Sequence, residues 1–397
     1  MYDIIKTECK ALSFAFTDSL KAIFTDSGAI LILLLAAMLY PVVYSIAYSE
    51  EVLTELPVVM VDNDNTATSR QWVKMMDATP QLNIIKQTAE MASAEQLFWE
   101  GEVKAILKVP SGFEKKIFKS EQASISMYAD ASNFLFYKET LKSTMQATGT
   151  LSAAIEFKRQ LAKGARPEQA MDRIQPIQTQ VYNLYNPSGS YGSFVMPGIM
   201  LIIIQQTLLI GIGLVGGAGR ERKRDLTKTL GFDLKKHAFA TILGKSLAYF
   251  LIGVFNLLFA MVLVYHWFSF PTKGEFFNVI VLSIPYLFSI IFMGMAISLG
   301  FKHREYSIMF LVFLTPIVLF ITGLSWPIEA MPELLHSVFK LVPSTHMVPA
   351  YIRLRTMGVS LSEIKPELSA LSIQMLLYFF LAVVGFKIAM KKKPDSV

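Results

Sequence analysis

The feature that most constrains this chain is the run Phe194–Ala218, about 25 residues without an ionisable side chain, followed directly by a basic cluster. Seven Lys and Arg residues lie between Arg220 and Lys236. A charge-free run of this length can cross a hydrocarbon core of about 30 Å as a helix. Lys and Arg beside a span are retained on the cytoplasmic side of the membrane. The sequence therefore predicts an integral membrane protein in which this basic segment is cytoplasmic.

Composition and charge distribution agree with this prediction. The chain of 397 residues is 53% hydrophobic and 17% charged, whereas a soluble domain carries about 25% charged residues. The pI is near 9.1 and the mean hydropathy is +0.44. Residues 50–191 hold 15 Lys and Arg against 17 Asp and Glu, while the rest of the chain holds 22 against 14. The excess positive charge lies at the ends of apolar runs, so we expect contact with membrane lipid and no nucleic-acid partner.

Six apolar runs are long enough to cross a membrane. They are Ala29–Ala47, Phe194–Ala218, Leu247–Phe268, Phe277–Phe301, Ser307–Ser325 and Leu371–Met390. If the amino terminus is inside, 16 basic residues fall on cytoplasmic segments and five fall on the two short external loops. This asymmetry predicts that both termini lie in the cytoplasm.

The first apolar run has two interpretations. The sequence Ser45-Ile46-Ala47 resembles the cleavage site of a signal peptide, but the run of 19 residues is longer than the usual core of about 7–15 residues. We therefore interpret residues 29–49 as a retained membrane span. Residues 1–28 ahead of it have the spacing of an amphipathic helix, which we expect to lie on the inner leaflet. A frayed terminus is the alternative.

Residues 50–191 predict a separate domain outside the cytoplasm. Strand candidates at 57–62, 82–87, 103–109 and 123–129 alternate with helical stretches at 66–77, 91–100 and 111–119. This alternation predicts a mostly parallel α/β sheet. A long helix is expected from Phe134 to about Met171, with interruptions at Gly164 and Pro167. The remaining spans and loops occupy residues 192–397, including a cytoplasmic loop at 219–237.

Chemistry in this external domain is limited to one pair of carboxylates. Asp62 and Asp64 could bind a cation, but such residues also end strands and cap the next helix, which is the interpretation we favour. Residues 50–191 contain neither His nor Cys. The sequence therefore offers no zinc site and no set of residues for a hydrolase, and we predict that the chain is not an enzyme.

Two short motifs within the spans need separate interpretations. Gly244-Lys245-Ser246 resembles the end of a phosphate-binding loop, but Phe239 stands where that loop needs a glycine, so we expect no ATP site. Gly213 and Gly217 form a Gly-x-x-x-Gly pair, which allows close helix contact and possible dimerisation.

Polar residues inside the spans are few. No Asp, Glu, Lys or Arg lies deep in any run, which argues against an ion-coupled secondary transporter. Gln205, Gln206 and Asn256 are polar and deep. They either form hydrogen bonds between helices or line a path for a transported substrate.

Three stretches together resemble the type-2 permeases of bacterial ABC exporters. Val59–Pro110 carries MVDNDNTATSRQW and MDATPQL and overlaps GEVKAILKVPSGF at Gly101–Phe113. Tyr185-Asn186-Pro187, followed by the motif FVMPG from Phe194, is similar to the entry to the second span of these permeases. Gly323–Gly358 reads GLSWPIEAMPELLHSVFKLVPSTHMVPAYIRLRTMG and is the most specific of the three.

The resemblance implies an α-helical membrane protein with six transmembrane helices and an inserted extracytoplasmic α/β domain. Such a permease lies in the bacterial cytoplasmic (inner) membrane as half of a dimer, with an identical or a paralogous partner. It exports a hydrophobic or amphipathic substrate, such as a drug or a lipid. A periplasmic adaptor and an outer-membrane channel often complete the pathway. A membrane-anchored sensor that uses the external domain is the alternative.

The resemblance also assigns roles to particular residues. A separate ATPase subunit, which binds ATP and Mg, would dock on the loop that follows the second span, and this chain would bind no cofactor itself. The loop residues are Arg220, Glu221, Arg222, Lys223, Arg224 and Asp225. The family usually has a glycine where Asp225 stands, so the fit to an ATPase departs from the pattern there. Prolines break the segment 326–349 into short pieces that survive near a membrane only when buried in protein or facing water. A re-entrant external gate is therefore expected, formed by Trp326, Pro327, Met331, Pro332 and Pro343.

Overall fold

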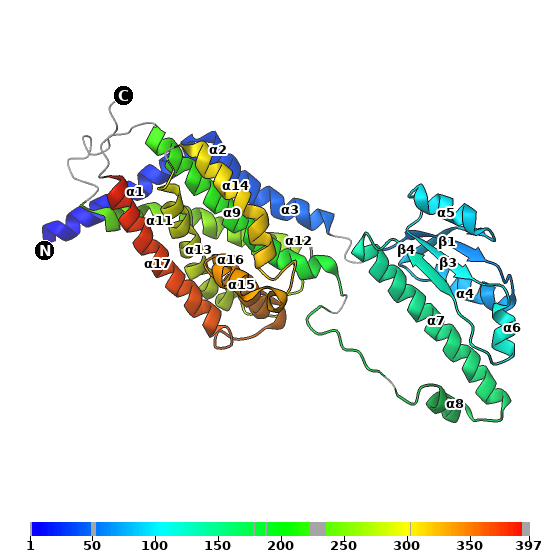
Figure 1. Cartoon of the computed structure of the whole chain (residues 1–397). Coiled ribbons are helices and arrows are strands. Elements are labelled where there is room, and N and C mark those ends of the chain that lie inside the picture. Colours follow the sequence, from blue (N-terminus) through cyan, green and yellow to red (C-terminus); the bar gives the residue numbers. More distant parts are fainter. Residues whose placement is uncertain are drawn as a thin grey trace. The chain divides into compact units, whose positions relative to one another are not determined.

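The computed structural model describes residues 2–48, 53–177, 179–186, 189–221, 236–301 and 303–390 (Figure 1). The chain divides into two units. The helical unit comprises Met1–Ser49 and Asn183–Val397, and the inserted unit comprises Glu50–Tyr182. The predicted fold class is confirmed, because six apolar helices of membrane-spanning length occur together with a small α/β sheet inserted between the first two.

The helical unit contains six candidate membrane spans within the described residues. They are Ser27–Ala47, Tyr191–Ala218, Ala238–Trp267, Phe276–Ser298, Arg304–Ile321 and Lys365–Ala389. Each overlaps one predicted apolar run. The third begins earlier than Leu247, because the helix includes Lys245, whose ammonium group lies 5.6 Å from the centre of the Phe386 ring. The predicted span began at Leu247 because hydropathy alone excluded the charged Lys245.

The spans are built from α-helices and short wider turns. In chain order, the elements of the helical unit are α1 (Tyr2–Thr25), α2 (Ser27–Ile30), η1 (Leu31–Ala36), α3 (Ala37–Ala47), α9 (Tyr191–Glu221), α11 (Ala238–Leu258), η2 (Phe259–Val264), α12 (Tyr265–Trp267), α13 (Phe276–Ser298), α14 (Arg304–Ile321), η3 (Ile328–Ala330), α15 (Glu333–Phe339), α16 (Pro343–Ile352), η4 (Arg353–Met357) and α17 (Lys365–Ala389). The elements η1, η2 and η4 are π-helical, whereas η3 is a 3₁₀ turn.

Helix α9 is the central element of the helical unit. It packs against α3, α11, α13, α14 and α16. Its apolar window is 78% buried, whereas the windows of α14 and α17 are 22% buried. A helix that is apolar on all sides is expected in the middle of a bundle. The two outer helices leave apolar side chains exposed, as a lipid-facing surface requires.

The amino-terminal helix α1 packs against α11. Ala11 and Ala15 are fully buried on the face that meets α11, and a Cβ atom at Gly244 would collide with the carbonyl oxygen of Leu12. The Gly-Lys-Ser motif therefore supplies a close helix contact. The predicted position of α1 on the inner leaflet stays a prediction.

The inserted unit is a four-stranded sheet with helices on both faces. Its elements are β1 (Leu56–Asp62), α4 (Ala67–Asp77), β2 (Leu82–Thr88), α5 (Met91–Trp99), β3 (Ala105–Val109), α6 (Phe113–Phe118), β4 (Ser126–Ala129), α7 (Phe134–Ala162) and α8 (Pro167–Ile174). The strand order is β2-β1-β3-β4. Strand β1 is parallel to β2 and β3, and β4 is antiparallel to β3. The mostly parallel sheet is thus confirmed.

The central strand β1 is buried on both faces, which explains its continuous apolar sequence. Val58 and Met60 lie in the core shared with α4 and α7, whereas Val59 and Val61 lie in the core shared with α5. The predicted long helix ends at Ala162, because Gly164 adopts a positive φ of 85° and Pro167 begins α8. Both predicted interruptions therefore separate two helices.

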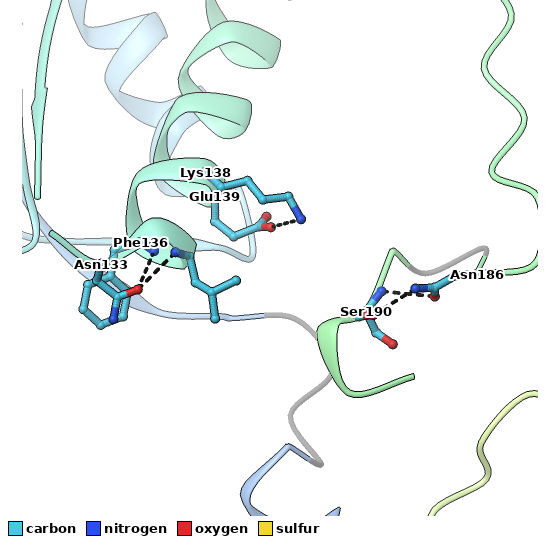
Figure 2. Close-up of polar contacts among 7 residues, drawn as sticks. Asn133, Phe136, Lys138, Glu139, Asn186 and Ser190 are labelled. Atoms are coloured by element: carbon cyan, nitrogen blue, oxygen red, sulfur yellow. Dashed lines mark hydrogen bonds and ion pairs between the residues drawn. The ribbon is translucent and has the colours of Figure 1, made fainter. Parts of the chain in front are cut away.

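A side-chain cap fixes the start of α7, and a side-chain amide holds the residue before α9 (Figure 2). In the inserted unit, Asn133 Oδ1 accepts hydrogen bonds from the backbone N–H groups of Leu135 at 3.0 Å and Phe136 at 3.3 Å. In the helical unit, the amide of Asn186 bonds to both the N–H and the carbonyl of Ser190, just before α9. Capping of this kind satisfies backbone groups that a helix end leaves unpaired.

The end of α3, where the chain leaves the helical unit, meets the start of α9, where the chain returns to it. The rings of Tyr48 and Tyr191 lie 5.6 Å apart. A Cβ atom at Gly192 would also come too close to the Tyr48 carbonyl oxygen. The chain therefore departs for the inserted unit and returns from it at neighbouring positions.

Candidate functional site

The segment between α14 and α17 enters the interior of the bundle. The backbone N–H of Ser344, at the start of α16, donates a hydrogen bond of 2.9 Å to Gln205 Oε1 on α9. Both residues are fully buried. Gln205 lies 11 residues beyond Phe194, which is about 16 Å along a helix. The first turn of α16 is therefore near the middle of the apolar layer.

Helix α17 anchors the same segment from another side. Gln374 Nε2 donates a hydrogen bond of 2.6 Å to the carbonyl oxygen of Lys340. The hydroxyl group of Tyr378 donates to the carbonyl oxygen of Leu341. These carbonyls belong to the turn between α15 and α16, where an α-helix cannot pair them. Side chains of α17 satisfy them instead, as buried backbone groups require.

The predicted gate residues begin the short pieces of this segment. Pro327 precedes η3, Pro332 precedes α15, and Pro343 is the first residue of α16. A proline suits these positions because its fixed φ and missing N–H cost nothing at a helix start. Trp326 is 56% exposed, and Met331 is half-buried. The five residues therefore follow one another along the segment, and only Pro343 is buried.

Helix α15 presents a mixed surface to its surroundings. Leu334, Leu335 and Val338 are exposed, and so are Glu333 and Lys340. The carbonyl of Lys340 is held by Gln374, three residues inside the predicted apolar run Leu371–Met390. Charged side chains at membrane depth are expensive unless they face water or protein. This surface therefore exposes apolar and charged side chains next to one another.

Two of the three residues predicted for a substrate path form hydrogen bonds to other elements. Gln205 holds α16, as described above. Asn256 on α11 is fully buried and donates from Nδ2 to the carbonyl oxygen of Leu33 at 2.7 Å. Gln206 is buried, and neither of its amide atoms has a hydrogen-bond partner among the described residues. Two of the three therefore form hydrogen bonds between helices, and the substrate path stays a prediction.

The contact of Asn256 depends on a feature that the sequence did not reveal. Leu33 lies in the π-helical turn η1, and its side chain occupies the space that a Cβ atom at Gly211 would need. The first span is thereby fixed against both α9 and α11. A polar residue at 256 and a glycine at 211 were the only signals of this contact in the sequence, and neither identifies its partner.

The predicted ATPase-coupling residues lie at the limit of the described chain. Arg222, Lys223, Arg224 and Asp225 fall outside the described residues, whereas Arg220 and Glu221 form the last turn of α9. On the far side of this segment, His237 Nδ1 lies 2.8 Å from Glu8 Oε1 of α1. The predicted docking loop is therefore flanked by the end of α9 and by the contact of α1 with α11.

The Gly-x-x-x-Gly pair is used within the chain. A Cβ atom at Gly213 would collide with Ser307, and one at Gly217 would collide with the backbone of Arg304. Both partners belong to α14, which packs along α9. The close contact that the motif allows is therefore made with α14.

The carboxylates of the inserted unit act as helix caps. Asp64 Oδ1 and Oδ2 accept hydrogen bonds of 3.0 Å from the N–H groups of Phe113 and Glu114 at the start of α6. Glu114 Oε1 in turn accepts from the N–H and the hydroxyl group of Thr68 in α4. Asp62 accepts from the N–H of Asp64 and from the hydroxyl of Ser69. The predicted structural role is confirmed, but its detail is wrong: Thr66 caps the next helix, α4, whereas Asp64 binds the start of α6.

These hydrogen bonds also set the titration of Asp64. Partial burial raises the pKa of its carboxyl group, but bonds from the Thr66 hydroxyl and the α6 backbone outweigh it and hold the pKa below the ordinary value of 3.8. Hydrogen bonds to the charged form favour ionisation. Across the described residues, no group of three or more His, Cys, Asp and Glu side chains is arranged to hold a metal ion.

Comparison with known proteins agrees with this arrangement. The family model described as ABC-2 family transporter protein matches residues 28–384. The match begins in the first span, includes the inserted unit and ends in the sixth span. No curated protein matches the chain.

Proposed function

Because the chain belongs to the ABC-2 family of transporter proteins, and is therefore a multi-pass membrane permease of an ABC transporter, we propose that it exports a hydrophobic or amphipathic substrate. The substrate leaves the cytoplasm or the inner leaflet, and a drug or a lipid fits this class. A separate ATPase subunit binds ATP and Mg and supplies the energy.

The observation that carries this proposal is the bond between Gln205 and Ser344. Helix α9 runs without a break from Tyr191 to Glu221, so one rigid element joins the basic segment to the buried start of α16. A displacement of the cytoplasmic end of α9 by the ATPase is passed to Ser344 through this bond. Packed elements with two arrangements transmit such shifts.

The orientation follows from the basic residues. The 219–237 loop and both termini face the cytoplasm, and the inserted unit lies outside it, because 16 basic residues fall on the cytoplasmic segments and only five on the two short external loops. The membrane is the bacterial inner membrane. In a cell with an outer membrane, a periplasmic adaptor and an outer-membrane channel receive the substrate from the inserted unit.

A second permease copy, identical or paralogous, covers the mixed surface of α15. Charged Glu333 and Lys340 beside exposed Leu334 suit a water-lined vestibule between two subunits better than a lipid-facing surface. The segment 326–349 then forms the external gate of that vestibule.

Co-purification with the ATPase encoded beside this chain tests the proposal. The double variant Arg222→Glu, Arg224→Glu should lose the ATPase, because it reverses charge in the docking loop. The matched control Lys115→Glu, Lys119→Glu makes the same change of net charge on exposed residues of the inserted unit, and it should keep the ATPase. Dye accumulation in inverted membrane vesicles then measures export. A wild-type permease that purifies alone and drives no accumulation would contradict the proposal.

A further inference from the structure

A second buried polar cluster lies apart from Gln205, at the loop that joins the third and fourth spans. It consists of Arg355 on η4, Tyr265 on α12 and Tyr351 on α16. Their exposed fractions are 8%, 3% and 0%. The guanidinium carbon of Arg355 lies 4.9 Å from the centre of the Tyr265 ring. Arg355 Nη2 donates a hydrogen bond of 3.2 Å to the carbonyl oxygen of Met261.

The cluster has more hydrogen-bond donors than acceptors. Arg355 forms no ion pair with any described Asp or Glu, and its buried Nε has no hydrogen-bond partner there. The buried hydroxyl groups of Tyr265 and Tyr351 interact with each other, yet neither makes a well-formed hydrogen bond with any described residue. Even a bond between these two hydroxyls would leave one O–H donor unpaired. The Met261 carbonyl is the one acceptor that the described chain supplies to Arg355.

Arg353 shows what an ordinary arginine does in the same element. Two positions before Arg355, it forms an ion pair of 2.7 Å with Glu367 and donates to the carbonyl oxygen of Glu363 at 2.6 Å. Arg353 is partly exposed and still has a carboxylate partner, whereas Arg355 is buried and has none in the described part of the chain. Burying a charge without a partner is costly, and ionisable groups kept at such a cost in membrane proteins mark binding sites.

The chemistry of these donors selects an anion. A guanidinium group matches the oxygens of a phosphate or a carboxylate, and its bonds to charged acceptors are stronger than those to neutral ones. We propose that Arg355, Tyr265 and Tyr351 form a binding site for a phosphate or carboxylate group. The oxygens of such a group would accept from Arg355 Nε and from the tyrosine hydroxyls.

The position of the cluster limits where that group comes from. The carbonyl oxygen of Arg355 accepts hydrogen bonds from the N–H groups of Lys273 and Gly274, in the loop between α12 and α13. This loop lies at the end of the third span, where phospholipid phosphates are found. The phosphate of a lipid headgroup and a free anion, or an acidic group on the substrate, share the required chemistry.

Thermal unfolding of the full chain in neutral detergent, with inorganic phosphate replacing chloride at constant ionic strength, tests the site. The wild-type midpoint should rise with phosphate and saturate. Arg355→Gln should abolish this response. Tyr351→Phe removes one hydroxyl group and keeps the ring, so it should fold and should raise the half-saturating phosphate concentration about tenfold.

Arg353→Gln is the matched control, because it removes the same charge from the same element. It should lower the midpoint in the absence of phosphate and keep the phosphate response. The proposal fails if phosphate acts no differently from chloride on the wild type, or if Arg355→Gln and Tyr351→Phe respond as the wild type does.

Native mass spectrometry separates the two sources. The chain is extracted from vesicles of mixed phosphatidylglycerol and phosphatidylcholine. Retention of phosphatidylglycerol by the wild type but not by Arg355→Gln assigns the site to a lipid headgroup. A phosphate response without lipid retention assigns it to a free anion or an acidic substrate. Neither result depends on the direction of transport, so the site can fail while the export function stands.

Discussion

In the inserted unit, every oxygen of Asp62 and Asp64 accepts a hydrogen bond, whereas in the helical unit Gln206 and Arg355 bury polar atoms that have no partner among the described residues. The two carboxylates connect a strand end to helix starts, so their bonds stabilise the fold. Helix α7 departs from this pattern, because the hydroxyl groups of Thr140 and Thr144 are buried and unpaired in the described structure.

The difference shows which contacts stabilise each unit. The helical unit is held by close helix packing at small residues, as at Gly217 against α14 and Gly244 against α1. Its interhelical hydrogen bonds contribute about 0.6 kcal/mol each on average. Polar groups that remain partly unpaired in such a bundle are therefore better explained by binding and movement than by stability. Four predictions test this comparison.

The largest effect is expected from a single methyl group added to a helical glycine in each unit. Gly217→Ala places a Cβ atom against the backbone of Arg304, which cannot move aside, and should destabilise the α9–α14 contact by about 3 kcal/mol. Gly149→Ala on α7 meets nothing within 4 Å and should stabilise α7 by about 0.5–1 kcal/mol. Hydrogen–deuterium exchange of α9 and α7 measures both. Effects of the same sign would contradict the packing argument.

The next effect concerns the cap of the inserted unit. Asp64→Ala removes the acceptor for the first N–H groups of α6 and should lower the free energy of unfolding by about 2 kcal/mol. Urea unfolding of residues 53–182 provides the measurement. Asp130→Ala is the control, because Asp130 is half-buried and its carboxylate accepts hydrogen bonds only from Ser132, two positions further along the chain. If Asp130→Ala lowers the free energy of unfolding as much as Asp64→Ala does, the hydrogen bonds of Asp64 to α6 contribute no more stability than those of Asp130.

A smaller change in stability but a clear change in function is expected at Gln205. Gln205→Leu leaves the Ser344 N–H without its acceptor and should cost about 1 kcal/mol. Export should fall much more than ATP hydrolysis, because the connection between α9 and α16 is lost. Gln205→Glu keeps an acceptor oxygen at the same position and should retain more export. Equal losses of hydrolysis and export in the Leu variant would contradict the proposed connection.

The smallest effect is a dependence of the inserted unit on pH. The carboxyl group of Asp64 has a folded-state pKa below 3.8, so its ionised form stabilises the fold. This contribution is complete above the unfolded-state pKa and is lost as the pH falls through the lower folded-state value. The urea midpoint of the wild type should therefore fall below pH 4 more steeply than that of Asp64→Asn. If the urea midpoints of the wild type and Asp64→Asn fall in parallel with pH, Asp64 does not cause the pH dependence.

Much of the fold followed from local sequence. The run from Phe194 lacks charges and is the central span, and the β-branched run from Pro57 is the buried strand β1. Asp62 was interpretable as a turn residue because its partners lie within seven positions of it. In each case, the property of one segment is enough to define its structure.

The contacts of the candidate site could not be predicted in this way. Gln205 and Ser344 are 139 residues apart in sequence, and nothing at either position specifies the other. The π-helical turn η1 exposes the Leu33 carbonyl to Asn256, but its sequence is as apolar as that of a regular span. Arg355 was counted only as an external-loop charge, because burial depends on how η4 packs against α12.

The contact between Tyr48 and Tyr191 has an evolutionary consequence. Because α3 and α9 come together where the chain leaves and re-enters the bundle, a turn of a few residues could replace the whole of the inserted unit without disturbing a span. Insertions succeed at such exposed, adjacent ends. A six-helix ancestor could therefore acquire, exchange or discard this module in one genetic event, and the membrane spans and the inserted unit could diverge at separate rates.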